Sequence, residues 1–131
     1  VTETVPDGDL ATFAALVQPV LGEQCANPSC HGRAERPLAV FAVGLHRAAS
    51  ADLHLTAPLT MDELRHNALR VRSFMVGVER IEDCAVLRKP LAPSAGGWEH
   101  GGGTRFVDQS DAGYRDLAAW LAASNSSAVA P

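Results

Sequence analysis

The sequence predicts an all-α protein, and two observations indicate this. Apolar residues recur at helical spacing in several segments, while runs of strand length that alternate apolar and polar residues are absent. The chain has 131 residues, the size of one domain, and contains no internal repeat. We therefore expect a single domain over residues 1–131, with a core at about 9–123 between a flexible N-terminal segment and a C-terminal tail.

The first predicted helix covers residues 9–24. Asp7 or Asp9 can cap the amide groups of its first turn. Pro19 should bend this helix or divide it into two short pieces. Its apolar stripe consists of Leu10, Phe13, Val17, Val20 and Leu21.

Two further helices are predicted in the middle of the chain. A polar turn covers residues 25–36, and the spacing of apolar residues in 37–47 predicts one short helix. Thr60 and Glu63 form a capping box at the start of a helix over 60–76. One stripe of that helix carries Met61, Leu64, Ala68, Val71 and Met75.

The C-terminal part is predicted to hold a long loop and a closing helix. Residues 88–105 combine Pro with several Gly, and a long loop in a compact domain is more often functional than idle. The last helix begins near Ser110 or Asp111, and residues 124–131 are expected to form a frayed tail or linker. One face of this helix carries Tyr114, Leu117, Ala118 and Leu121.

Composition and charge argue against two functions. Lys and Arg total 11 against 15 Asp and Glu, a net charge of −4, and the basic residues are scattered rather than clustered as in a nucleic-acid binder. No apolar run is long enough to form a transmembrane segment. No signal peptide is visible, and since the chain starts with Val1 we expect a mature or trimmed chain that has lost an export signal or anchor. Only 5% of residues are aromatic, so the core is short of large side chains.

The segment from Cys25 to His31 carries the chemistry. It reads Cys-Ala-Asn-Pro-Ser-Cys-His, and two thiols followed at once by an imidazole are what covalent haem attachment needs. In such an attachment each thiol would add to one vinyl group, and His31 would become the proximal iron ligand. The common spacing places two residues between the thiols, whereas this chain has four. Pro28 can loop the extra pair outward, so that Cys25 and Cys30 still reach the haem.

Three other interpretations of these residues stay open. A disulfide between Cys25 and Cys30 would close a very small loop in an oxidising compartment, but it leaves His31 unexplained. A zinc site needs further ligands, and the sequence has no second Cys-x-x-Cys and no His-x-x-x-His. A thioredoxin-like dithiol needs a βαβ context that an all-helical chain lacks.

The order of these segments resembles a class I cytochrome c, in which an N-terminal helix leads into the attachment motif and a C-terminal helix with aromatic residues closes the domain. More narrowly, the chain resembles a group of bacterial cytochrome c domains with three further blocks. Here the blocks are Lys89-Pro90-Leu91, Gly96-Gly97-Trp98-Glu99-His100-Gly101-Gly102-Gly103, and the helix from Tyr114 to Leu121. The resemblance covers roughly residues 9–123, and the spacing of Cys25 and Cys30 departs from the usual pattern.

The resemblance implies a monohaem c-type cytochrome that transfers electrons and transforms no substrate. Its haem c would be held by Cys25, Cys30 and His31, with the N- and C-terminal helices packed around it. The macrocycle would also supply the bulky apolar group that the core lacks. A periplasmic or otherwise extracytoplasmic location follows, because bacterial haem attachment takes place outside the cytoplasm. The partner would be another redox protein or a larger respiratory or oxidoreductase assembly.

The second iron ligand in such proteins is usually Met or His, and His100 in the Gly-rich block is the natural candidate. Gly residues permit unusual dihedral angles and close approach of the backbone to a flat cofactor, and we expect Trp98 to pack nearby. Met75 is the second choice. His66 is expected on a solvated helix face, and His46 and His54 flank a polar connection.

An alternative function follows if His100 does not bind iron. A five-coordinate haem would be open to peroxide or small gases, and the chain would be a peroxidase or a gas-binding sensor domain. Cys84 is left over, and we expect a small buried hydrophobe, with an intermolecular disulfide as the alternative. Arg88 and Lys89 are either partners of the haem propionates or plain solvated charges.

Overall fold

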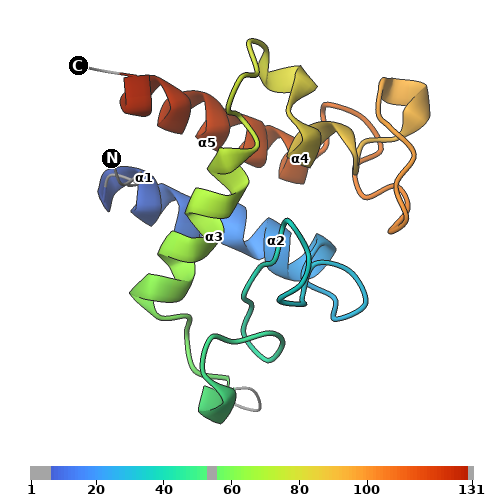
Figure 1. Cartoon of the computed structure of the whole chain (residues 1–131). Helices are drawn as coiled ribbons and strands as arrows, with labels where there is room; N and C mark the ends of the chain where they lie inside the picture. Colours follow the sequence, from blue (N-terminus) through green and yellow to red (C-terminus); the bar gives the residue numbers. More distant parts are fainter. Residues whose placement is uncertain (1–6, 53–55, 130–131) are drawn as a thin grey trace. The chain divides into compact units, whose positions relative to one another are not determined.

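The regular elements of the protein are all helical, as a computed structural model describes them for residues 7–52 and 56–129 (Figure 1). Over these ranges no strand is formed, and Leu91 and Phe106 make an isolated β-bridge. The all-α class is therefore confirmed. The chain divides into two compact units, Val1–Arg70 and Val71–Pro131. That these make up a single domain stays a prediction.

The first unit starts with a helical run that contains one wider turn. Helix α1 (Asp7–Thr12) passes into a π-helical turn (Phe13–Val17) and then into α2 (Gln18–Gln24). The Gln18 N–H donates to the Phe13 carbonyl, and Pro19, which has no N–H to donate, follows directly. The division expected near Pro19 is this π-turn. Leu10, Phe13, Val17 and Leu21 of the predicted stripe are buried, and Val20 is half-buried.

The helix predicted over 37–47 is wrong, because this segment is irregular. Its backbone groups are bonded outside any helical pattern. The Phe41 N–H donates to Asn67 Oδ1 (2.9 Å), and the Ala42 N–H donates to the His46 carbonyl (3.0 Å). A tertiary partner at Phe41 and a local turn at Ala42 have replaced the bonds that a helix would need, so the weak local preference was overruled.

Helix α3 (Met61–Ser73) begins with the predicted capping box. The Glu63 N–H donates to Thr60 Oγ1 (3.1 Å), and the Thr60 N–H donates to Glu63 Oε1 (2.9 Å). The predicted apolar stripe is only partly right, since Met61 is 52% exposed. Glu63 and Asn67 are almost completely buried on this helix, although both are polar.

The second unit contains α4 (Ala85–Arg88), a 3₁₀ turn on either side of it (Ile81–Asp83 and Pro93–Ala95), and α5 (Ala112–Val129), which contacts α4. Asp111 Oδ1 accepts the Gly113 N–H (2.9 Å) at the start of α5, as expected. The tail predicted from residue 124 is wrong as far as Val129, because α5 continues to that residue. None of the helices described is both long and apolar enough to cross a membrane.

Candidate functional site

The two cysteines and the histidine of the predicted attachment motif lie in one tight turn after α2. Cys25 ends that helix, with its N–H donating to the Leu21 carbonyl (2.9 Å). The chain then folds back, so that the His31 N–H donates to the Cys25 carbonyl (3.1 Å). Cys25, Cys30 and His31 are each half-buried, and the Cys30 thiol is free. The structure therefore brings the three predicted residues of the motif together.

The residues between the thiols turn outward. Asn27, Pro28 and Ser29 are exposed, and Asn27 Oδ1 accepts both the N–H (2.9 Å) and the hydroxyl (2.7 Å) of Ser29. Such a side-chain turn lets the chain reverse without a helix or sheet partner. At Gly32 a Cβ atom would overlap the Ala26 carbonyl, so the residue after His31 must lack a side chain. The outward loop expected at Pro28 is present.

The imidazole of His31 is oriented by a backbone carbonyl. Its Nδ1 lies 2.8 Å from the Leu38 carbonyl oxygen. Because a carbonyl only accepts, Nδ1 carries the proton, and the neutral ring has its lone pair on Nε2. Metal-ligating histidines commonly bond in this way through the nitrogen that does not bind the metal. The donor set of two thiols and one oriented imidazole thus fits a covalently bound haem.

The other histidines of the first unit differ from expectation. His66 is half-buried rather than solvated, because its Nε2 bonds the Ala39 carbonyl (3.1 Å) and its ring packs on Phe41 at 4.7 Å between centroids. His46 stacks on the same ring at 4.9 Å. His54 lies outside the described residues. His66 and His46 therefore have packing roles around Phe41.

The Gly-rich block lies in the second unit on the loop expected there. The Trp98 N–H donates to the Arg88 carbonyl (2.9 Å), while the Arg88 guanidinium lies over the Trp98 ring, 4.7 Å from its centroid. Arg88 also donates to the Gly96 carbonyl and to Asp83, at 3.3 Å each. Arg88 is thus engaged in holding this loop, whereas Lys89 is exposed.

His100 lies in a short turn closed by two bonds with Gly103. The Gly103 N–H donates to the His100 carbonyl (2.8 Å), and His100 Nδ1 lies 3.2 Å from the Gly103 carbonyl. Gly103 has a φ of 77°, which a residue with a side chain rarely adopts. His100 and Trp98 line the same open hollow of about 520 Å³, together with Pro93, Glu99, Gly101, Gly103 and Thr104. That Trp98 packs against the His100 imidazole stays a prediction.

Met75 and Cys84 are both buried in the second unit. Met75 is 5% exposed and follows α3, in keeping with a packing role as much as with a ligand. Cys84 is fully buried, and burial raises the pKa of its thiol, so that it stays protonated. The prediction of a small buried hydrophobe at this position is confirmed.

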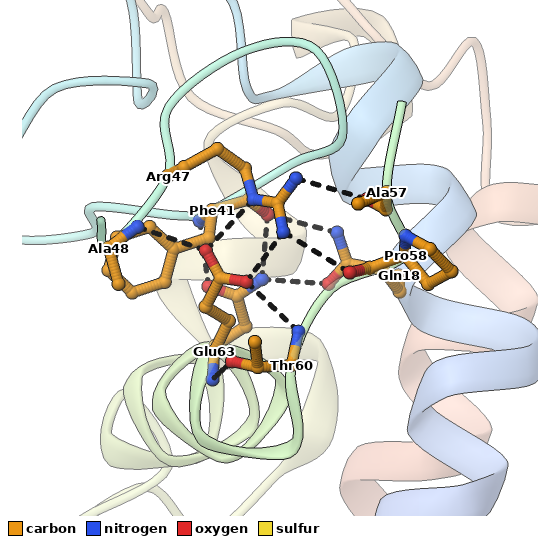
Figure 2. Close-up of polar contacts among 9 residues, drawn as sticks. Gln18, Phe41, Arg47, Ala48, Ala57, Pro58, Thr60 and Glu63 are labelled. Carbon is orange, nitrogen blue, oxygen red and sulfur yellow. Dashed lines mark hydrogen bonds and ion pairs between the residues drawn. The ribbon is translucent and has the colours of Figure 1, made fainter. Parts of the chain in front are cut away.

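A buried polar cluster in the first unit was not anticipated from the sequence (Figure 2). Arg47 donates to both oxygens of Glu63 (3.0 Å each) and to the carbonyls of Ala57 (3.0 Å) and Pro58 (3.2 Å). The hydrogen bond from Arg47 lowers the pKa of Glu63 to about 2, and the N–H groups of Ala48 and Thr60 add to this. One feature of the sequence could have indicated this cluster. Glu63 and Asn67 are two polar residues, four positions apart, on a helix face that is otherwise apolar.

Comparison with known proteins adds no assignment. No family model matches the chain, and no curated protein or solved structure matches it either. Within the described ranges, no three or more His, Cys, Asp or Glu side chains are grouped to hold a metal ion. The chemistry of the motif therefore has to be argued from its own residues.

Proposed function

We propose that this chain is a monohaem c-type cytochrome that transfers electrons through a covalently attached haem c, with a cytochrome c-like fold around it. The observation that carries the proposal is the turn from Cys25 to His31. It holds both cysteines and His31 in one turn of the backbone, with His31 Nδ1 bonded to the Leu38 carbonyl. A disulfide would leave that orientation of His31 without a purpose, and a zinc site would need further ligands, for which the sequence offers no second Cys-x-x-Cys and no His-x-x-x-His.

Each residue of the turn has a distinct role in this proposal. Cys25 and Cys30 would hold the haem through two thioethers, one to each vinyl group, which would fix the cofactor in a small protein. His31 presents Nε2 as the proximal ligand. When bound, the haem supplies an iron atom that takes up and releases one electron. The exposed turn at Pro28 absorbs the two additional residues of the motif.

His100 is the proposed distal ligand, and Met75 is the second choice. Support for His100 comes from its place beside an open hollow and from its Nδ1 contact with the Gly103 carbonyl, which leaves the ring lone pair on Nε2. Met75 is a buried side chain in the turn that follows α3, where a packing role explains it equally well.

The proposed setting is periplasmic or otherwise extracytoplasmic, with a redox protein or a larger oxidoreductase assembly as partner. Electron-transfer encounters use small, transient interfaces. The chain carries a net charge of −4, and haem propionates would add to it, so we expect a basic docking patch on the partner. Association should then slow as ionic strength rises.

The test is the pyridine haemochrome spectrum of the purified protein, expressed with a haem-attachment system. Wild type should give a c-type spectrum with one haem per chain. Cys25→Ser or Cys30→Ser should shift the spectrum to that of a single thioether, and the double variant should retain no covalent haem. Cys84→Ala is the matched control and should behave as wild type. A wild-type protein without covalent haem would overturn the proposal and favour the disulfide.

The coordination state separates electron transfer from the alternative function. Two axial ligands should give a six-coordinate, low-spin ferric spectrum and slow binding of carbon monoxide to the reduced protein. A resting high-spin spectrum with rapid binding would instead indicate a five-coordinate peroxidase or gas-binding sensor domain. One optical spectrum of each oxidation state decides between them.

A further inference from the structure

Segment 38–41 contains the carbonyl that accepts the hydrogen bond from His31 Nδ1, yet this segment belongs to no helix or strand. The Leu38 carbonyl bonds His31 Nδ1 (2.8 Å), and the Val40 N–H donates back to the His31 carbonyl (2.9 Å). Leu38, Ala39 and Val40 are buried. A buried irregular segment must find partners for its backbone, and those partners decide where the Leu38 carbonyl points.

Asn67 of α3 supplies the partners at the end of this segment. Its Oδ1 accepts the Phe41 N–H (2.9 Å), and its Nδ2 donates to the Phe41 carbonyl (2.8 Å). Asn67 Nδ2 also donates its second hydrogen bond to Gln18 Oε1 (2.7 Å). Gln18 Nε2 in turn donates to the Phe41 carbonyl (3.0 Å), and Figure 2 shows Gln18 and Phe41. The amide of Asn67 is fully buried and bonds both the N–H and the carbonyl of Phe41, as a neighbouring strand would do in a sheet.

We propose that Asn67, supported by Gln18, is the positioning residue for the proximal ligand. It fixes segment 38–41 so that the Leu38 carbonyl stays aligned with His31 Nδ1. This inference rests on the proposed function, because it treats His31 as an iron ligand. It adds one specific consequence: the side-chain amide of Asn67 on α3 influences the midpoint potential of the iron.

The physical link runs through the Nδ1 hydrogen bond. A strong bond from Nδ1–H to a carbonyl makes the imidazole a better electron donor through Nε2 and stabilises the ferric state. If segment 38–41 shifts, this bond lengthens and the ligand donates less. We therefore expect the midpoint potential to rise when Asn67 loses its hydrogen bonds.

A purely structural role for Asn67 predicts a different pattern, and Glu63 provides the matched control. Glu63 is on the same helix, one turn earlier, and is equally buried in a hydrogen-bonded cluster. Its partners are Arg47, Ala48 and Thr60, and none of them belongs to segment 38–41. Glu63→Gln should therefore lower stability without moving the Leu38 carbonyl.

The experiment compares Asn67→Leu and Glu63→Gln in the haem-loaded protein. Asn67→Leu should raise the midpoint potential and speed amide exchange at Val40 and Phe41 roughly tenfold beyond any change in Glu63→Gln, as expected for losing buried hydrogen bonds. Glu63→Gln should leave the potential at the wild-type value. Equal potentials in the two variants would overturn the proposal.

Two further measurements cover the remaining outcomes. If Asn67→Leu does not fold, Gln18→Leu removes one donor to the Phe41 carbonyl and should give a smaller shift of the same sign; no shift would overturn the inference. The ¹⁵N spectrum of the histidines reports the His31 Nδ1–H bond directly, in wild type and variant, whether or not haem is attached. Haem-free wild type would overturn the proposed function, whereas an Nδ1–H signal unaffected by Asn67→Leu would overturn the positioning role alone.

Discussion

The two segments that carry the proposed axial ligands are held by different means. His31 belongs to a turn whose neighbouring segment is held by the half-buried Gln18 of α2 and the buried Asn67 of α3, with every polar atom of the Asn67 amide hydrogen-bonded. His100 sits on a surface loop, closed by backbone bonds to Gly103 and by one exposed stack of Arg88 on Trp98.

This difference separates a fixed ligand from an adjustable one. A buried network resists rearrangement because each broken bond leaves an unsatisfied polar group out of contact with water. An exposed loop can exchange its bonds for water at little cost, and it opens at lower free energy than the core. We therefore expect the His31 side of the proposed haem site to keep a fixed geometry. The loop that carries His100 should open more easily and so control which other ligands reach the iron.

The largest expected effect separates the two histidines themselves. His31→Ala should abolish the native low-spin spectrum and sharply reduce haem incorporation, because it removes both the ligand and its bond to Leu38. His100→Ala should keep the covalent haem but convert the ferric spectrum to high spin. Met75→Ala is the control and should stay low spin. A weak far-red band of sulfur ligation in wild type would show that Met75, not His100, is the distal ligand.

The next effect concerns the buried ion pair of the first unit. Glu63→Leu would leave Arg47 buried without its carboxylate, and removing one partner of such a pair costs about 3–5 kcal/mol. Urea denaturation, followed by circular dichroism, measures the loss. Asp62→Leu is the matched control, since the Asp62 side chain is on the same helix but 96% exposed. Equal losses in both variants would contradict the assigned role of the pair.

Lowering the pH should weaken the same ion pair, because protonation removes the charge of Glu63. The pKa of Glu63 is about 2 in the folded protein, lowered chiefly by the Arg47 hydrogen bond from an ordinary value of 4.5. A carboxylate with a depressed pKa stabilises the fold above about pH 4.5, and this contribution is lost as pH falls towards 2, at most roughly 3 kcal/mol. Wild-type stability should therefore fall over this interval more steeply than that of Glu63→Gln. Parallel curves would contradict the prediction.

The smallest effect is expected on the distal loop. Arg88→Met removes the stack on Trp98 and the bonds to the Gly96 carbonyl and to Asp83. A cation–π contact at an exposed site contributes about 0.5–1 kcal/mol, and an exposed ion pair adds little. Global stability should change by no more than this, while amide exchange at Trp98 increases. Lys89→Met, at the exposed neighbouring cation, is the control. A loss comparable to that of Glu63→Leu would remove the contrast between the two regions.

Local patterns in the sequence anticipated much of the fold. The capping box of Thr60 and Glu63, the stripe from Leu10 to Leu21 and the start of α5 after Asp111 each depend on residues within a few positions of one another. The false helix over 37–47 and the misplaced His66 share another cause. Both depend on partners many residues away, Asn67 for one and Ala39 for the other.

The sequence by itself determined the chemistry of the candidate site, because Cys25, Cys30 and His31 are adjacent enough for their spacing alone to bring them into one turn. It also determined the helical class, through periodicity that each helix carries within itself. Only the tertiary structure decided how His31 is oriented. That orientation depends on the Leu38 carbonyl, and the carbonyl depends on Asn67 and Gln18, 49 residues apart in the chain. A hydrogen bond over such a separation has no local pattern, since it forms only after the helices that carry its two ends have packed.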